Sequence, residues 1–185
     1  MAEMSLEQRQ YLTAKFKEFI AAVHSSHESN LPVRTPYQWQ IRLMLYVAEH
    51  GYWPRSIGAP TASGKTSVID IHVFLNAMAG LSLVEGNGLF DLPLRNIPRR
   101  LALTVNRRSL VDDQFDEACA LQDKMQIEHV ANDGLDVYRD GLKLRAAIND
   151  GTKSDSAIPR MIAVELRGSI SPDREWRYYP QTCAV

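Results

Sequence analysis

The chain has 185 residues and a formal net charge of -1, with 45% apolar and 23% charged residues, as is ordinary for a globular domain. This length permits one domain with its own core, and the apolar content argues against a long disordered tail. No run approaches the ~18 apolar residues that a membrane span needs. The near-neutral charge excludes a strongly basic nucleic-acid-binding protein. It does not exclude a protein that contacts the backbone of a nucleic acid at a few positions.

Helical periodicity dominates the first part of the sequence. Ser5 and Gln8 form a capping-box pattern, and apolar residues at helical spacing predict a helix over residues 5–24. A second helix is predicted from Pro36, which suits a first helical position, to Gly51, which would end it. A short strand over 55–58, a glycine-containing turn and a third helix over 65–79 follow.

From residue 80 onward, predicted helices alternate with predicted strands. Glycines and prolines over 80–98 predict an irregular insertion. Helices are predicted from Ser109 and from Leu135, and apolar runs predict strands at 101–105, 127–130, 161–164 and 182–185. We therefore expect an α/β fold with a mostly parallel sheet and helices on both faces.

The cysteines indicate the cellular compartment, and the histidines raise the question of a metal site. The acidic N-terminus lacks the apolar stretch of a signal peptide, and Cys119 and Cys183 lie far apart, so we expect a cytoplasmic protein without disulfides. His24, His27 and Glu28 could suggest a metal site. A polar helix end is the simpler interpretation, because a site needs a further ligand at a defined geometry.

The strongest signal is the segment Ala59-Pro60-Thr61-Ala62-Ser63-Gly64-Lys65-Thr66, between a predicted strand and a predicted helix. That context is typical of a phosphate-binding loop, in which backbone N–H groups and the helix dipole attract the anion. Lys65 would contact the β- and γ-phosphates and the Thr66 hydroxyl would bind Mg²⁺. The sequence therefore predicts that ATP and Mg²⁺ bind here.

Ala-Pro-Thr-x-x-Gly-Lys-Thr resembles motif I of superfamily 2 helicases, whose first position is Ala or Gly. The resemblance implies a RecA-like first lobe of a DEAD/DEAH-like motor. An upstream glutamine reads the adenine in that family, and here Gln40, with Gln38 second, lies at the matching place. The residues around Arg107, Arg108 and Ser109 look like motif Ia, which would contact the backbone of single-stranded DNA.

Further short matches narrow the resemblance to the helicase–nuclease of type I CRISPR systems, subtype I-U/I-G. They are Trp39-Gln40 before Trp53-Pro54, Asp70-Ile71, Pro98-Arg99-Arg100, Val111-Asp112 and Leu166-Arg167-Gly168 before Asp173-Arg174-Glu175-Trp176. This implies ATP-driven translocation on single-stranded DNA and a CRISPR RNA-guided surveillance complex as partner. On this basis residues 1–34 form a helix and linker, and residues 35–185 form the ATP-binding lobe.

The sequence lacks a recognisable carboxylate for ATP hydrolysis. Asp116-Glu117-Ala118 imitates the helicase Asp-Glu motif but fits a helix better, and Glu165 follows a predicted strand. Together with the strand predicted at the C-terminus, this suggests a fragment that ends before the hydrolytic residues. The alternatives are a small P-loop phosphotransferase that uses Glu165, or a non-catalytic nucleotide-binding remnant.

Overall fold

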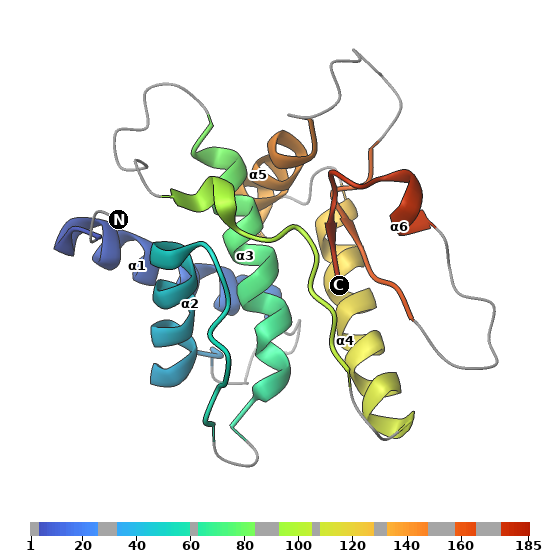
Figure 1. The fold of residues 1–185 in the computed structure, drawn as a ribbon, viewed down its shortest axis with the longest axis horizontal. Coiled ribbons are helices and arrows are strands. Elements are labelled where there is room, and N and C mark those ends of the chain that lie inside the picture. Colours follow the sequence, from blue (N-terminus) through green and yellow to red (C-terminus); the bar gives the residue numbers. More distant parts are fainter. Residues whose placement is uncertain are drawn as a thin grey trace.

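The computed structural model describes residues 4–25, 33–59, 63–83, 93–104, 108–127, 133–147, 158–165 and 175–185. Helices make up most of these residues, and short parallel strands lie at one side (Figure 1). Within these ranges, no helix is both long and apolar enough to cross a lipid bilayer.

The first two helices have local start and stop signals. Helix α1 (Leu6–Val23) begins with a capping box in which the Ser5 hydroxyl accepts from the Gln8 N–H and the Gln8 side chain accepts from the Ser5 N–H. Helix α2 (Gln38–His50) ends at Gly51, whose φ of 75° is left-handed. The predicted start at Pro36 was two residues early, because Tyr37 is the N-cap residue.

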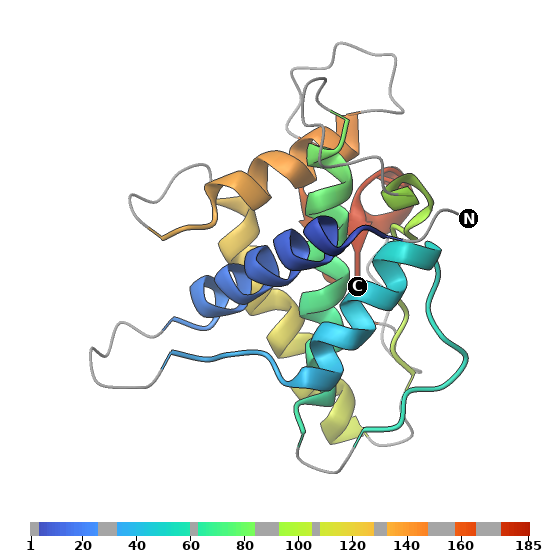
Figure 2. The ribbon, with the colours of Figure 1, turned by 90° about the vertical axis from the view of Figure 1, so that its left-hand side faces the viewer.

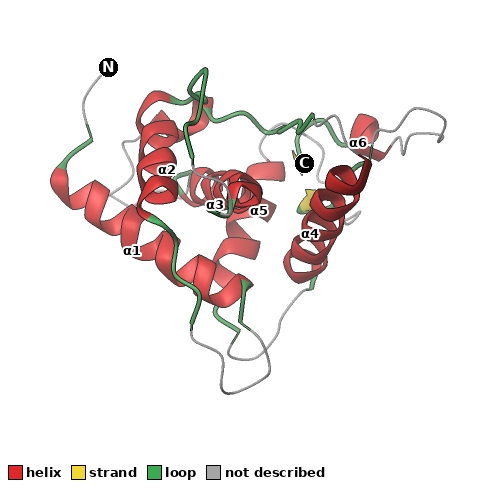
Figure 3. Cartoon of the chain, turned by 90° about the horizontal axis from the view of Figure 1, so that it is seen from below, coloured by secondary structure: helices red, strands yellow, loops and turns green. Residues whose placement is uncertain are grey.

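Helix α3 (Val68–Leu81) forms the centre of the molecule. All twelve residues from Ile69 to Gly80 are buried, as expected for a mostly apolar helix, although the twelve include the polar residues Asp70, His72 and Asn76. Helices α1, α2 and α5 (Asp136–Ala147) surround it, which is clearest when the molecule is seen from below (Figure 3). A three-residue 3₁₀ turn, Lys65–Ser67, leads into α3.

Helices α1, α3 and α5 share an aromatic core. The rings of Phe16 and Phe74 lie 5.1 Å apart, and those of Phe19 and Tyr138 lie 4.9 Å apart edge to face. Such tilted contacts are favourable beyond the apolar area that they bury. The Tyr138 hydroxyl also donates to the Lys15 carbonyl at 2.8 Å, so this core fixes α1 across the other helices (Figure 2).

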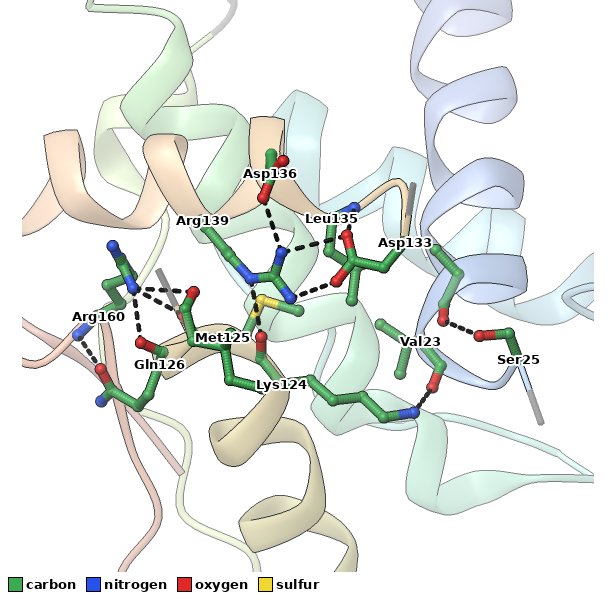
Figure 4. A network of polar contacts seen from close by, with 12 residues as sticks. Val23, Ser25, Lys124, Met125, Gln126, Asp133, Leu135, Asp136, Arg139 and Arg160 are labelled. Atoms are coloured by element: carbon green, nitrogen blue, oxygen red, sulfur yellow. Dashed lines mark hydrogen bonds and ion pairs between the residues drawn. The ribbon is translucent and has the colours of Figure 1, made fainter. Parts of the chain in front are cut away.

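Helix α4 (Arg108–Gln126) is tied to α1 and α5 at its C-terminal end (Figure 4). Arg139 is 1% exposed, and its guanidinium donates to Asp133 and Asp136 and, through Nε, to the Lys124 carbonyl at 2.9 Å. The Lys124 ammonium in turn donates to the Val23 carbonyl. Bonds to backbone carbonyls satisfy the last turn of a helix, so the network fixes where α4 ends.

Three extended segments pair in parallel. Strand β1 (Met161–Ile162) pairs with β2 (Cys183–Ala184), and Arg100 forms a parallel bridge to Ala184 on the other side. The Leu101 N–H donates to the Ala184 carbonyl at 2.9 Å. The C-terminal strand therefore lies between the two earlier segments. A short helix, α6 (Glu175–Tyr178), precedes it, and a 3₁₀ turn over Pro93–Asn96 follows α3.

The expectation of a RecA-like α/β lobe with helices on both faces of a mostly parallel sheet is wrong. The described residues are mostly helical and contain two short strands and one bridge. One reason is the segment 55–58, predicted as a strand, which has no partner strand and whose one large apolar side chain, Ile57, is 41% exposed. Another is α3, which fills the core that a sheet was expected to occupy.

The remaining predicted elements are found in part. The helices predicted from Ser109 and Leu135 correspond to α4 and α5, which begin one residue earlier and one residue later. The strands predicted at 161–164 and 182–185 are present but shorter. Residues 101–104 of the strand predicted at 101–105 belong to no named strand, and residue 105 lies outside the described part of the chain. Residues 128–130 of the strand predicted at 127–130 lie outside the described part of the chain.

Candidate functional site

The predicted phosphate-binding loop precedes the 3₁₀ turn and α3. Its helix is confirmed, whereas the strand predicted before it is absent from residues 55–58. Gly64 has a left-handed φ of 70°, which glycine adopts without strain. Lys65 is exposed and Thr66 is half-buried. Of the other predicted loop residues, Ala59 and Ser63 are half-buried, and Pro60, Thr61 and Ala62 lie outside the described residues.

Two neighbouring side chains of α2 hold the loop. The Trp39 indole N–H donates to the Ser63 carbonyl at 3.0 Å, and the Gln40 amide donates to the Gly64 carbonyl at 3.2 Å. The Gln40 carbonyl oxygen accepts from the Tyr37 N–H at 2.7 Å. Gln40 is 3% exposed and both ends of its amide have backbone partners, so in this structure its contacts position the loop.

The Thr66 hydroxyl lies against a carboxylate. The Glu117 carboxylate, on α4, lies near enough to the Thr66 hydroxyl for that hydroxyl to lower the pKa of the carboxyl. Burial and the nearby Asp70 carboxylate raise the pKa of Glu117 above its usual range, and His24, Arg34 and the Thr66 hydroxyl oppose that shift. Glu117 lies on a helix, as the sequence predicted, but its side chain reaches the hydroxyl predicted to bind Mg²⁺.

Three potential metal ligands converge beside this pair. His24 ends α1, Asp70 lies in the first turn of α3 and Glu117 projects from α4. One ligand atom of each lies within 4.8 Å of the other two. His24 Nε2 is 3.0 Å from the Asp70 carboxylate, and Arg34 donates to His24 Nδ1 at 3.1 Å. The cluster therefore combines an imidazole with two carboxylates.

Residues predicted to contact DNA lie at the start of α4. Arg108 is its first residue and Ser109 is exposed. Arg107 and the side chain of Arg108 lie outside the described part of the chain. Helices α3 and α4 begin at the same end of the molecule, the lower end in Figures 1 and 2. The positive ends of both helix dipoles are thus directed toward that end, where they favour anions.

Glu165, the carboxylate of the alternative phosphotransferase interpretation, lies in a different part of the molecule from the predicted loop. It lines a cavity of about 410 Å³ between residues 100–104, the N-terminal half of α4 and the ends of β1 and β2. Among the described residues that line this cavity, neither Lys65 nor Thr66 is present. Within the described residues, the carboxylate that lies beside Thr66 is that of Glu117, and the alternative based on Glu165 stays a prediction.

Sequence analysis missed the pairing of His24 with Asp70 and Glu117. It considered His24 beside His27 and Glu28, both of which lie outside the described residues. His24 and Asp70 are 46 positions apart, and no local pattern links residues on three separate helices. Only the packing of α1 and α4 against the start of α3 brings these side chains together.

No family model, curated protein or solved structure matches the chain. The resemblance to helicases therefore depends on the sequence motifs alone.

Proposed function

We propose that this chain binds the phosphates of ATP, together with a divalent cation, at residues 59–67 and the start of α3. The observation that carries the proposal is the position of the Glu117 carboxylate, which lies beside the Thr66 hydroxyl and Asp70 at the start of α3. That hydroxyl is the one in the loop that the motif assigns to Mg²⁺.

The phosphates would bind at the positive end of α3. The first N–H groups of a helix have no partners within it, and the aligned peptide dipoles attract anions. Lys65 is exposed at this position and can supply a positive charge. Gly64, in its left-handed conformation, allows the chain to turn into the helix without a side chain in the way.

The cation would lie between the phosphates and α4. Mg²⁺ in phosphate-binding loops is held by a Ser or Thr hydroxyl and by an acidic residue. Thr66 and Glu117 provide this pair from two elements that are distant in sequence. A bound cation would also offset the repulsion between the Glu117 and Asp70 carboxylates.

The wider role proposed is that of the ATP-binding part of a DNA helicase or translocase in antiviral CRISPR interference, in the cytoplasm. Its support is the helicase-like motif and the position of the α4 start at the same end as the loop. There Arg107, Arg108 and Ser109 would contact the backbone of single-stranded DNA. Gln40 would read the adenine if its amide exchanged its present backbone partners for the base.

The test is a titration of the chain with Mg²⁺-ATP, followed by calorimetry, together with an assay of phosphate release. We expect weak binding without turnover. Lys65→Ala should weaken binding by about tenfold or more, because a charge-assisted phosphate contact contributes about 1.5–3 kcal/mol. Lys143→Ala, at an exposed lysine of α5, is the matched control and should bind as the parent chain does.

Unchanged affinity in Lys65→Ala would contradict the proposed phosphate site. Thr66→Val tests the cation separately, because it removes the hydroxyl and keeps the shape of the side chain. It should weaken binding of Mg²⁺-ATP more than binding of ATP in the presence of a chelator. Phosphate release that Lys65→Ala abolishes would contradict the expectation that the chain alone does not hydrolyse ATP.

A further inference from the structure

We propose that His24, Asp70 and Glu117 form a site for a first-row transition-metal dication, such as Zn²⁺ or Mn²⁺, which binds without nucleotide. The site shares Glu117 with the proposed ATP site, but it does not depend on Lys65 or on phosphate. Its ligands come from the end of α1, the first turn of α3 and the middle of α4.

The geometry of the three side chains is close to that of a metal site. One nitrogen or oxygen atom of each lies within 4.8 Å of the others. Ligands on one zinc ion lie about 2.0–2.2 Å from it and hence about 3–4 Å from one another. His24 Nε2 and the Asp70 carboxylate, 3.0 Å apart, already meet that spacing, and the Glu117 carboxylate, within 4.8 Å of both, would have to move closer to complete the set.

The charges of the site favour a cation. Asp70 is 2% exposed, and the nearby Glu117 carboxylate is partly buried. These two carboxylates have oxygen atoms within 4.8 Å of each other, and like charges held this close repel. A dication between them would replace that repulsion with two attractive contacts.

The imidazole determines which cation is preferred. Mg²⁺ and Ca²⁺ bind oxygen ligands almost exclusively, whereas Zn²⁺ and other first-row dications accept imidazole nitrogen. One histidine with two carboxylates is therefore a better site for Zn²⁺ or Mn²⁺ than for Mg²⁺. Thr66, whose hydroxyl lies near the Glu117 carboxylate, would then lie next to the ion.

Arg34 occupies the outer side of the histidine and opposes metal binding. A guanidinium only donates hydrogen bonds, so its contact with Nδ1 makes Nδ1 the acceptor and leaves the proton on Nε2, facing Asp70. Metal binding at Nε2 requires that this proton leave and that Nδ1 be protonated. Arg34 is exposed, so it can turn away, and its positive charge also repels the incoming ion.

The test is titration of the folded chain with Zn²⁺, and separately with Mg²⁺, in the absence of nucleotide. We expect one Zn²⁺ per chain and much weaker binding of Mg²⁺. His24→Gln and Glu117→Gln should each weaken Zn²⁺ binding by more than about tenfold, since even loss of a ligand's supporting partner costs about 10–100-fold. Asp113→Asn, at an exposed carboxylate of α4, is the control and should leave binding unchanged.

Two further variants distinguish metal binding from damage to the fold and from nucleotide binding. Arg34→Ala should strengthen Zn²⁺ binding, an effect opposite in sign to damage of the fold. Lys65→Ala should retain Zn²⁺ binding even where it loses ATP, so failure of the nucleotide proposal and failure of the metal proposal give different results. Circular dichroism of each variant verifies that the helices are intact.

Absence of Zn²⁺ binding by the folded parent chain would overturn the proposal. So would binding that persists unchanged in both His24→Gln and Glu117→Gln, because the ion would then lie elsewhere. Weaker binding in Arg34→Ala would overturn the role given to that arginine.

Discussion

At the scale of single residues, the contacts of Gln40 decide how the loop is held. This side chain connects the start of α2, through the Tyr37 N–H, to the Gly64 carbonyl. Because Gln40 is buried, loss of its amide would leave two backbone groups without their partners, and each buried polar group left unsatisfied costs about 1–3 kcal/mol. The same residue is the predicted adenine reader, so one substitution can test both roles.

Gln40→Met, which keeps the length of the side chain, should lower the free energy of unfolding by about 1–3 kcal/mol, as measured by urea denaturation. If Gln40 acts only through the loop, affinity for ATP and GTP should fall equally. A loss confined to ATP would instead show a contact with adenine. Gln8→Met is the control, because Gln8 makes the same capping contact at the exposed start of α1 and should cost less.

At the scale of elements, the crossing of α3 and α5 depends on two glycines. A Cβ atom on Gly80 would lie 1.7 Å from the Gly141 carbonyl oxygen, and one on Gly141 would lie 2.3 Å from the Ala77 carbonyl oxygen. These neighbours are backbone atoms, which cannot move without shifting a helix. The two helices therefore approach each other more closely than any larger residue would allow, and this fixes α5 against the central helix.

Gly141→Ala should lower stability by about 1–3 kcal/mol, the usual cost of overpacking, even though alanine is the better helix former. The melting temperature should fall by several degrees, on the order of 2–4 °C per kcal/mol for a chain of this size. Gly58→Ala is the matched control, since a Cβ there meets nothing within 4 Å, and its stability should be unchanged or slightly higher. Equal melting temperatures for the two variants would contradict the close crossing.

At the scale of the whole molecule, His72 links the core helix to the strands. It is fully buried on α3, and its Nε2 lies 3.3 Å from the Arg99 carbonyl, next to the bridge between Arg100 and Ala184. Burial lowers its pKa from 6.5 to about 4. The ring is therefore neutral in the folded protein at pH values where the unfolded chain would already carry the proton.

The pH dependence of stability follows from that difference. Between about pH 6.5 and pH 4 the unfolded state binds one more proton at His72 than the folded state, so stability falls as the pH is lowered. The loss approaches about 3 kcal/mol by pH 4. His72→Gln, which retains a donor for the Arg99 carbonyl, should lose less stability than the parent chain when urea unfolding is compared at pH 7 and pH 4.5. Equal losses in the two chains would exclude His72 as the cause.

Local patterns in the sequence determined the helices. The capping box at Ser5, the stop at Gly51 and the apolar periodicity around Leu121 depend on residues a few positions apart, and the corresponding helices lie close to where they were predicted. The same patterns could not establish a sheet, because short apolar runs such as 101–105 do not specify strand partners. The expected parallel sheet depended on such runs and its RecA-like form on the motif, and both were wrong.

Tertiary structure alone decided what the candidate site contains. The sequence identified Lys65 and Thr66 from one contiguous motif, and the ATP and DNA roles drawn from it stay predictions. His24, Asp70 and Glu117 come together only because α1 and α4 both pack beside the start of α3. Contacts between residues 46 or more positions apart depend on how helices are arranged in space, and the glycine crossing and aromatic core that set this arrangement are not encoded by any local spacing.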